Sequence, residues 1–291
     1  MGKYFGTDGV RGKANEGLTL DMSIKIGQYL GWYYGKEKHA KILIGKDTRL
    51  SGDMFELGLA AGATSMGAQV YLLGVCPTPA ISYLVRKERF DCGIMVSASH
   101  NPYYDNGIKC FNHNGEKMEE ELLLEVEKYM DGLTDLDLVT GDHIGEYFEW
   151  EDGLEIYMSW LKECVPVDLS GMKILCDLAN GSATSTAVET LDSLGATVDA
   201  INNSPNGINI NNKCGSTHPE GLQRMMREGD YDIGLAFDGD ADRLIMVDSD
   251  GKRCDGDYIL YICSRYMKSI NHLNKNMVVT TVMANLGLYK L

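Results

Sequence analysis

Three aspartates follow a short apolar segment in the run Asp238-Gly-Asp-Ala-Asp-Arg243. If this run is extended, alternate carboxylates project to one side, with small residues between them. Clustered carboxylates raise one another's pKa unless a cation neutralises them, and hard oxygen ligands suit Mg²⁺. The pattern predicts a magnesium site at Asp238, Asp240 and Asp242, and the alternative is an acidic turn in solvent. An EF-hand is excluded, because Arg243 stands where that loop requires Gly.

A second polar segment, Ser97-Ala-Ser-His-Asn-Pro102, also follows an apolar run, and Asn106-Gly-Ile-Lys109 comes shortly after it. Pro102 and Gly107 favour turns, so Ser99 can be held out from the sheet with a His, an Asn and a Lys in reach. A Ser beside a His also suggests acyl transfer, but adjacent residues at a strand end point in different directions. No G-x-S-x-G elbow is present either. The segment is therefore a nucleophilic serine loop or an ordinary polar loop.

Two Gly-flanked loops each combine a cation with backbone N–H groups. They are Gly6-Thr-Asp-Gly-Val-Arg-Gly12 and Gly45-Lys-Asp-Thr-Arg-Leu-Ser-Gly52. Such loops can cradle a phosphate, to which an arginine offers two parallel hydrogen bonds. Each loop alone is weak evidence. Together with a magnesium site and an exposed serine, they indicate phosphoryl transfer.

These four motifs, in this order and spacing, resemble the α-D-phosphohexomutase superfamily along the whole chain. The resemblance implies that Ser99 is the phosphoserine that donates and recovers the phosphoryl group. The metal ligands that it implies are Ser99, Asp238, Asp240 and Asp242. The catalytic residues that it implies are Ser99, His100, Lys109 and Arg11, with His100 and Lys109 as the groups for proton handling. The residues that it implies for binding the substrate phosphate are Arg11, Lys109 and Arg243.

The resemblance also implies a reaction and its cofactors. The segment from Cys214 to Glu220 and the Ala at 241 resemble the glucosamine branch. Members of that branch convert glucosamine 6-phosphate into glucosamine 1-phosphate through a bound 1,6-bisphosphate, for UDP-N-acetylglucosamine synthesis. The expected cofactors are Mg²⁺ and a hexose 1,6-bisphosphate that phosphorylates Ser99. Three alternatives stay open: a phosphomannomutase or phosphoglucomutase, a non-catalytic fragment that binds Mg²⁺ and sugar phosphate, and a phosphatase with an Asp nucleophile.

Apolar runs that alternate with amphipathic stretches predict an α/β fold with crossover connections. In the phosphohexomutase fold that the resemblance implies, successive α/β domains have mixed sheets sandwiched by helices. The expected domains are 1–150 with the serine loop, 151–254 with the metal loop, and 255–291 as the start of a third.

The expected elements follow the same alternation. Expected helices lie at 20–35, 51–67, after Pro79, and at 119–129, 152–164, 182–194, 219–228 and 257–269. Expected strands lie at 41–45, 69–73, 92–97, 107–111, 173–177, 197–201, 232–237 and 277–283, with a hairpin through 248–251 and a link at 134–150.

The last expected strand, 277–283, would leave an apolar face with little to cover it, which indicates a chain cut from a longer one. The third domain is thus expected to be incomplete and the fourth absent. Those domains carry the sugar-reading and phosphate-gripping loops of the superfamily, so positioning worth about 7–11 kcal/mol is expected to be reduced. The chain alone is expected to be a poor or inactive mutase whose donor site can still form.

Composition and charge limit the classes of binding partner that this chain can have. The 291 residues carry 27 Lys and Arg against 42 Asp and Glu, a net charge of −15 without a basic run, so no nucleic acid is expected as a partner. No segment approaches the ~18 apolar residues of a membrane span, and the first residues lack an apolar signal core. Eight cysteines without a C-x-x-C pair indicate reduced thiols. We expect a cytoplasmic protein that binds a small sugar phosphate, without membrane contact, and a homodimer is one possible assembly.

Overall fold

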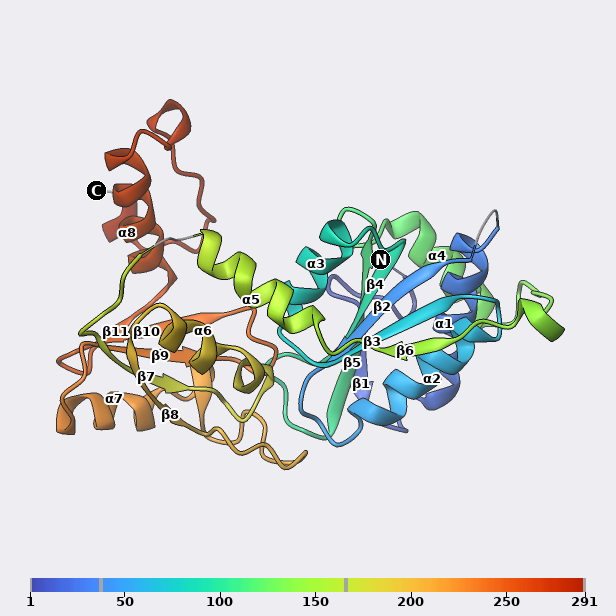
Figure 1. Cartoon of the computed structure of the whole chain (residues 1–291), viewed down its shortest axis with the longest axis horizontal. Coiled ribbons are helices and arrows are strands. Elements are labelled where there is room, and N and C mark those ends of the chain that lie inside the picture. The colour runs from blue at the N-terminus through green and yellow to red at the C-terminus, as the bar shows by residue number, and fades with distance from the viewer. Residues whose placement is uncertain (1, 37–38, 165–166, 290–291) are drawn as a thin grey trace.

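The computed structural model describes residues 2–36, 39–164 and 167–289 and contains two α/β units followed by a helical segment (Figure 1). The first unit is built on a sheet of order β1-β5-β4-β2-β3-β6. In this sheet β2 is parallel to β3 and β4, β6 is parallel to β3, and β5 is antiparallel to β4 and β1. The strands are β1 (Val10–Lys13), β2 (Lys41–Lys46), β3 (Gln69–Val75), β4 (Cys92–Val96), β5 (Asp105–Asn112) and β6 (Tyr147–Glu149).

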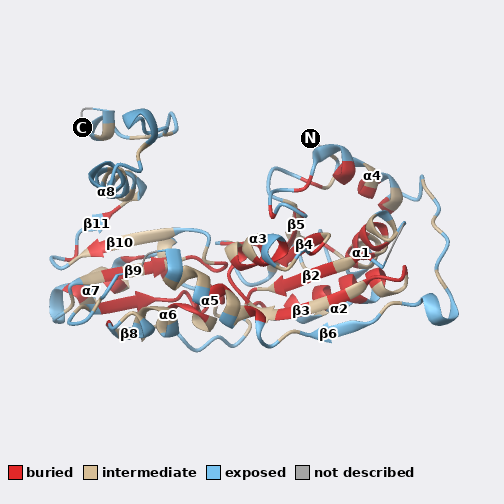
Figure 2. Cartoon of the chain, turned by 45° about the horizontal axis from the view of Figure 1, so that its top comes forward, coloured by how far each residue is buried: buried red, intermediate tan, exposed pale blue. Residues whose placement is uncertain are grey.

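Helices cover both faces of this sheet, because successive side chains of a strand point to opposite faces and the apolar run of β2 therefore needs cover on both. Ile42 and Ile44 pack into the core beneath α1, α2 and α4, whereas Leu43 packs into the core beneath α3 and α5. The helices are α1 (Leu20–Tyr34), α2 (Gly52–Thr64), α3 (Thr78–Lys87), α4 (Glu120–Met130) and α5 (Gly153–Cys164). Figure 2 shows that buried residues are concentrated in the strands and on the inner sides of these helices.

The second unit has a smaller mixed sheet of order β11-β10-β9-β7-β8. On its central strand, Ile174 and Cys176 face the core under α6, and Leu175 faces Leu222 and Met226 of α7. The strands are β7 (Lys173–Asp177), β8 (Thr197–Ile201), β9 (Ile233–Phe237), β10 (Leu244–Asp248) and β11 (Arg253–Cys254). The helices are α6 (Ala187–Ser193) and α7 (Glu220–Glu228), with short 3₁₀ helices at Ser182–Ser185 and Gly215–Thr217. A further 3₁₀ helix, Gly141–His143, precedes β6 in the first unit.

The two units meet where the loops that follow their parallel strands face each other. Thr48 Oγ1 after β2 donates to the carbonyl of Asn180 at 2.5 Å. The Thr78 N–H after β3 donates to the carbonyl of Asp240 at 2.9 Å. The carboxyl ends of parallel strands are the usual place for a ligand site in α/β folds. The residues that the motifs singled out are therefore brought to one interface.

The segment after Cys254 stands apart from both sheets (Figure 1). Helix α8 (Gly256–Ser269) is capped by Asp255, whose side chain accepts from the Asp257 N–H at 3.1 Å, and none of its residues is buried. A 3₁₀ helix at Asn274–Asn276 and α9 (Leu286–Tyr289) follow. The expected strand at 277–283 is wrong: these residues form no strand, and Val282 is 94% exposed. A strand needs a neighbour for its backbone hydrogen bonds, and no strand of the described ranges pairs with this segment.

Three further expectations need correction. The link at 134–150 contains β6, because Tyr147–Glu149 adds in parallel to the edge strand β3. Part of the first Gly-flanked loop is the strand β1, which pairs with β5. The helix expected at 182–194 is interrupted at Thr186, whose φ of −142° is not helical, so a 3₁₀ turn precedes α6.

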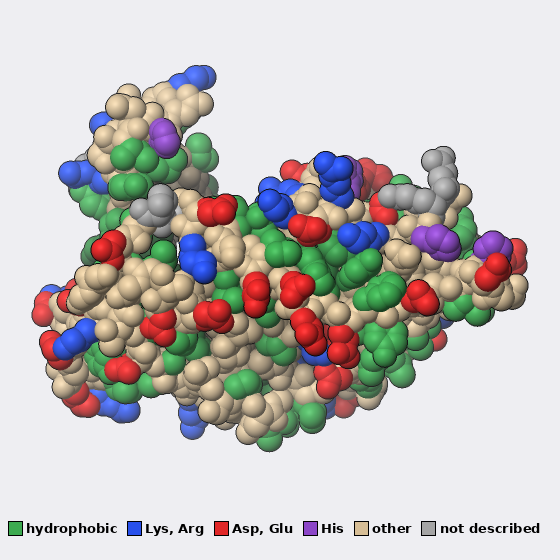
Figure 3. Space-filling view, viewed as in Figure 1, with side chains coloured by type: hydrophobic (Ala, Val, Ile, Leu, Met, Phe, Trp, Pro, Cys, Tyr) green, Lys and Arg blue, Asp and Glu red, His purple; other side chains and the backbone are tan. Residues whose placement is uncertain are grey.

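Acidic side chains are prominent on the molecular surface, in keeping with the net charge of −15. Figure 3 shows them gathered along the middle of one face, with basic side chains scattered around them. Among the helices of the described residues, none has the length and apolar character needed to cross a bilayer.

Candidate functional site

Ser99 lies in the loop after β4, and its backbone is in the left-handed region with a φ of +53°. The loop does hold it out of the sheet, but the second unit covers it, so the side chain is buried and not exposed as expected. Ser99 Oγ donates to Asp238 Oδ2 at 2.8 Å and accepts from Arg243 Nη2 at 2.9 Å. The hydroxyl therefore bridges an acid and a cation that both come from the other unit.

The three aspartates follow β9 in a tight turn and not in an extended run. The Ala241 N–H donates to the Asp238 carbonyl at 3.1 Å, and Ala241 has a φ of +54°. This turn brings one oxygen of each of Asp238, Asp240 and Asp242 within 4.8 Å of the others. The carboxylates converge as the motif predicts. They converge because the chain turns, and the expected alternation of side chains along an extended run is not the cause.

The pKa values of the two buried aspartates are shifted in opposite directions. Burial, together with the charges of Asp240 and Asp242, raises the pKa of Asp238 to about 7. Burial also opposes the ionisation of Asp240, but Lys109 and Thr78 outweigh it and lower the pKa of Asp240. Lys109 Nζ lies 2.5 Å from Asp240 Oδ2, and Thr78 Oγ1 donates to the same oxygen at 2.6 Å. Asp240 is thus held as an anion.

The donor set fits a divalent cation. Oδ1 of Asp240 is buried and has no hydrogen-bond partner within the described part of the chain. A buried carboxylate oxygen without a partner is costly, and a bound cation would satisfy it. Three carboxylates and the hydroxyl of Ser99 offer hard oxygen atoms, which suit Mg²⁺. Lys109 and Arg243 together supply two positive charges against three acidic groups.

Cationic side chains line a pocket of about 480 Å³ beside this cluster. Arg11 lies on β1 and Lys109 on β5, while the Ser99 loop follows β4, and these three strands are adjacent in the sheet. Arg243 joins them from the second unit. Asp8 also lines the pocket, and its carboxylate lies 3.9 Å from Arg11. Because positive groups from both units surround it, the pocket is suited to a phosphorylated ligand.

His100 lies beside this cluster of cations. Its Nδ1 accepts from Arg243 Nη2 at 2.7 Å, because a guanidinium can only donate. Burial, followed by the charges of Arg243 and Arg11, lowers the pKa of His100. The imidazole is therefore neutral near pH 7.

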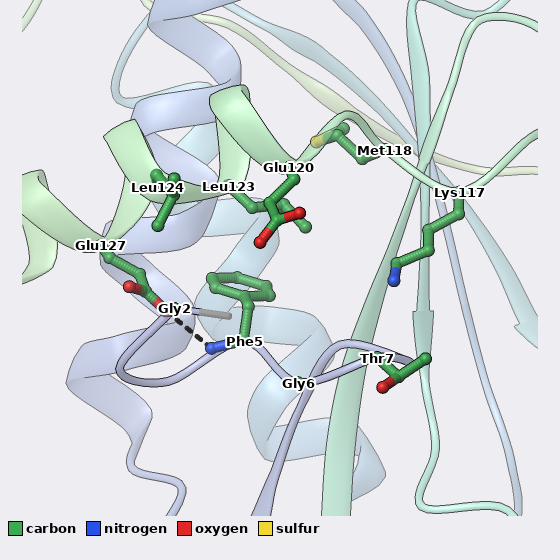
Figure 4. Close-up of a pocket in the computed structure, with 10 residues that line it drawn as sticks. All are labelled: Gly2, Phe5, Gly6, Thr7, Lys117, Met118, Glu120, Leu123, Leu124 and Glu127. Carbon is green, nitrogen blue, oxygen red and sulfur yellow. Dashed lines mark hydrogen bonds between the residues drawn. The ribbon is translucent and has the colours of Figure 1, made fainter.

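Lys117 is a pocket residue that no motif indicated. It is exposed and lies between β5 and α4, and it lines both the 480 Å³ pocket and a neighbouring pocket of about 350 Å³. Figure 4 shows its ammonium group extending toward Thr7 of the N-terminal segment. Glu127 anchors that segment by accepting the N–H groups of Lys3, Tyr4 and Phe5. A lone lysine between two elements carries no sequence signal, so only the packing of the N-terminal segment against α4 reveals it.

The second Gly-flanked loop does not cradle a phosphate with its arginine. Arg49 is buried, and its Nε donates to Asp47 Oδ2 at 2.8 Å. Its two Nη atoms donate to the carbonyls of the serine loop, at Ser99, Asn101, Pro102 and Asp105. All its hydrogen-bonding capacity is used inside the protein, so this arginine braces the loop.

Comparison with known proteins agrees with this arrangement. The family models for phosphoglucomutase/phosphomannomutase α/β/α domains I, II and III match residues 2–136, 155–251 and 255–291. The chain is 53% identical over 291 residues to the phosphoglucosamine mutase of Lachnoclostridium phytofermentans. It is also 53% identical over 294 residues to that of Lachnospira eligens. All of this chain is covered in both matches, but it spans only 65% of the length of each relative.

A solved structure shares the fold. It is a phosphoglucomutase/phosphomannomutase family protein from Burkholderia thailandensis, with a TM-score of 0.78 and 26% identity. The match covers 92% of this chain and 59% of that one. The three domain models match in succession along nearly the whole chain. By its sequence and its fold, the chain belongs to the phosphoglucomutase/phosphomannomutase family.

Proposed function

We propose that this chain is the phosphoryl-donor part of a phosphoglucosamine mutase, which interconverts glucosamine 6-phosphate and glucosamine 1-phosphate through a phosphorylated Ser99. The observation that carries the proposal is the position of Ser99 Oγ, hydrogen-bonded between Asp238 and Arg243 at the edge of a cationic pocket. Two relatives with that name, each 53% identical to the chain, support this choice of sugar.

In the proposed reaction a sugar hydroxyl attacks the phosphorus on Ser99. A new oxygen–phosphorus bond forms as the bond to Oγ breaks, and the bisphosphate later returns its other phosphoryl group to the same oxygen. Arg243 donates to Oγ and stabilises the charge left there, while Arg11 and Lys109 face the phosphoryl oxygens. A divalent cation held by the three aspartates would supply further positive charge at the reacting phosphoryl group.

Lys109 and His100 are the two candidates for proton handling, and their hydrogen-bond partners suggest a different role for each. Lys109 Nζ is engaged by Asp240 at 2.5 Å and by Asp242 at 3.4 Å, so we assign it the part of a fixed cation. His100 has only its Nδ1 in a hydrogen bond with Arg243 among the described residues. Because Nδ1 accepts from Arg243, the proton of the neutral ring lies on Nε2, so His100 takes the proton of the attacking hydroxyl at Nδ1 once Arg243 releases that nitrogen.

The test of this function uses the 291-residue chain with Mg²⁺ and a hexose 1,6-bisphosphate. We expect intact mass to show one added phosphoryl group and peptide mapping to place it on Ser99. With glucosamine 6-phosphate added, a coupled assay should detect at most slow formation of glucosamine 1-phosphate. Chelation with EDTA should stop phosphoryl uptake, and renewed Mg²⁺ should restore it. No phosphoryl uptake at Ser99 would refute the donor function, and a preference for mannose or glucose 6-phosphate would refute the sugar assignment.

Replacement of Lys117 by Gln should weaken the binding of phosphorylated ligand. A hydrogen bond to a charged group is worth about 1.5–3 kcal/mol, so the half-saturating hexose 1,6-bisphosphate concentration should rise at least about tenfold. The maximal rate of Ser99 phosphorylation should stay within about twofold, because Lys117 does not contact Ser99. Lys87→Gln, at the far end of α3, is the matched control. An unchanged half-saturation would exclude Lys117 from the ligand site.

A further inference from the structure

The carbonyl oxygen of Ser99 receives hydrogen bonds from both units of the protein. Arg49 Nη2 of the first unit donates to it at 2.8 Å, and Asn211 Nδ2 of the second unit donates to it at 2.8 Å. Asn211 Nδ2 also reaches the carbonyl of Asn101 at 3.2 Å, and Asn211 itself is buried. The peptide group that follows the nucleophile is therefore gripped from two sides.

This grip acts on a residue whose backbone is strained. Ser99 has a φ of +53°, a region that residues with a side chain rarely adopt unless their surroundings enforce it. The Ser99 N–H is held as well, because it donates to Ser97 Oγ at 2.9 Å, and Ser97 Oγ donates to Asp47 at 2.6 Å. The first unit thus holds both the N–H and the carbonyl of Ser99, and the second unit adds one hydrogen bond to the carbonyl, from the side-chain amide of Asn211.

Close packing leaves no room for the carbonyl to move toward the metal loop. A Cβ atom on Gly239 would lie 2.5 Å from the Ser99 carbonyl oxygen and 2.7 Å from Asn211 Nδ2. The turn of the three aspartates therefore passes directly over the hydrogen bond between Asn211 and Ser99. Among the described contacts, the side chain of Asn211 makes none with the three carboxylates.

We propose that Asn211 is a positioning residue that locks Ser99 in its left-handed conformation and so aims Oγ between Asp238 and Arg243. The proposal rests on the phosphoryl-donor function proposed above. When the amide donor is lost, the Ser99 carbonyl keeps only the hydrogen bond from Arg49, the strained backbone relaxes, and Oγ moves out of line with the phosphoryl group. Because the cations of the pocket are untouched, the rate of transfer falls while ligand binding is retained.

Asn211 itself has a left-handed backbone, with a φ of +57°. Two substitutions therefore distinguish the effect of losing the amide donor from the effect of straining the backbone at this position. Asn211→Asp keeps the shape of the side chain and replaces the amide donor by an acceptor that repels the carbonyl. Asn211→Gly removes the donor and accepts the left-handed backbone without cost. Asn271 is exposed, has the same φ of +57° and lies beyond α8, so Asn271→Asp and Asn271→Gly are the matched controls.

The experiment measures Ser99 phosphorylation by a hexose 1,6-bisphosphate in the full chain, together with crystal structures and thermal unfolding of each variant. Both Asn211 variants should lower the maximal rate by about 100-fold, as expected for a nucleophile misplaced by about 1 Å. Their half-saturating ligand concentration should stay within about threefold, because the cations of the pocket remain. Their crystal structures should show Ser99 outside the left-handed region, and the Asn271 variants should match the wild type.

Two outcomes would overturn the positioning role. One is a Ser99 that keeps its left-handed backbone in both variants with a rate near that of the wild type. The other is a parallel loss of rate, ligand binding and thermal stability, which would make Asn211 a general structural residue. If the wild type takes up no phosphoryl group but the variant structures still show a displaced Ser99, the proposed function fails and the positioning role stands.

Discussion

Ser99→Ala will take up no phosphoryl group from a hexose 1,6-bisphosphate, and any mutase turnover will fall by at least about 10⁴-fold. Loss of a nucleophile that acts as one unit with its partners has effects of this size. The fold should persist, because the side chain that is removed is small and Arg243 Nε already lies 3.4 Å from Asp238. The measurements are intact mass after incubation with the bisphosphate and the coupled mutase assay.

Ser204→Ala, an exposed serine in the second unit, is the control for this substitution and should behave as the wild type. A Ser99→Ala protein that keeps full activity would favour the alternative of an Asp nucleophile in the metal loop. Peptide mapping would then find the phosphoryl group on an aspartate. A loss of activity that comes with a large fall in thermal stability would point to unfolding and not to missing chemistry.

Lys109→Met should lower the free energy of unfolding by about 3–5 kcal/mol when Mg²⁺ is chelated with EDTA, because it leaves a buried carboxylate without its cation. The side chains of Lys109 and Asp240 are 9% and 0% exposed, so water screens their attraction little. Asp238 and Asp242 add repulsion once the lysine is gone. Chemical denaturation of the wild type and the variant measures the difference.

Saturating Mg²⁺ should recover part of this loss, because a bound cation stabilises the folded state and takes over the neutralisation of the three carboxylates. Lys128→Met is the matched control. Its partner Glu125 lies 2.6 Å away, but the two side chains are 52% and 47% exposed, so its removal should cost less than about 1 kcal/mol. If the loss in Lys109→Met is the same with and without Mg²⁺, then Lys109 and the cation do not neutralise the same charges.

Much of the fold followed from local patterns that tertiary packing then reinforced. Strands such as β2, β7 and β9 were predictable because their apolar runs are short and bounded by turn residues. The short strand β6 was not predictable, since it is exposed and gains its structure only from the free edge of β3. The strand predicted at 277–283 is absent for the same reason, because no partner edge lies beside it within the described residues. An apolar run has strand propensity, but a strand forms only where a partner edge is present.

The residue types of the site were determined by the sequence alone. The motifs contain the metal ligands and the nucleophile themselves, so they restrict the possible chemistry directly. One motif has three carboxylates with small residues between them, and the other has a serine beside a histidine after a strand. The motifs pointed to Ser99, Asp238, Asp240 and Asp242, and the structure brings these residues together. The binding of Mg²⁺ at this cluster stays a prediction.

Only the tertiary structure decided whether a polar residue outside the metal and serine motifs binds the ligand or supports the protein backbone. Arg49 lies in a motif typical of phosphate loops, yet burial turns all its donors to backbone carbonyls of the serine loop. Asn211 and Lys117 lie in no motif, and each acquires its place from a segment more than 100 residues away along the chain. The physical reason is that a donor's role depends on which acceptor the fold places within about 3 Å of it, and pairings between distant segments leave no local pattern.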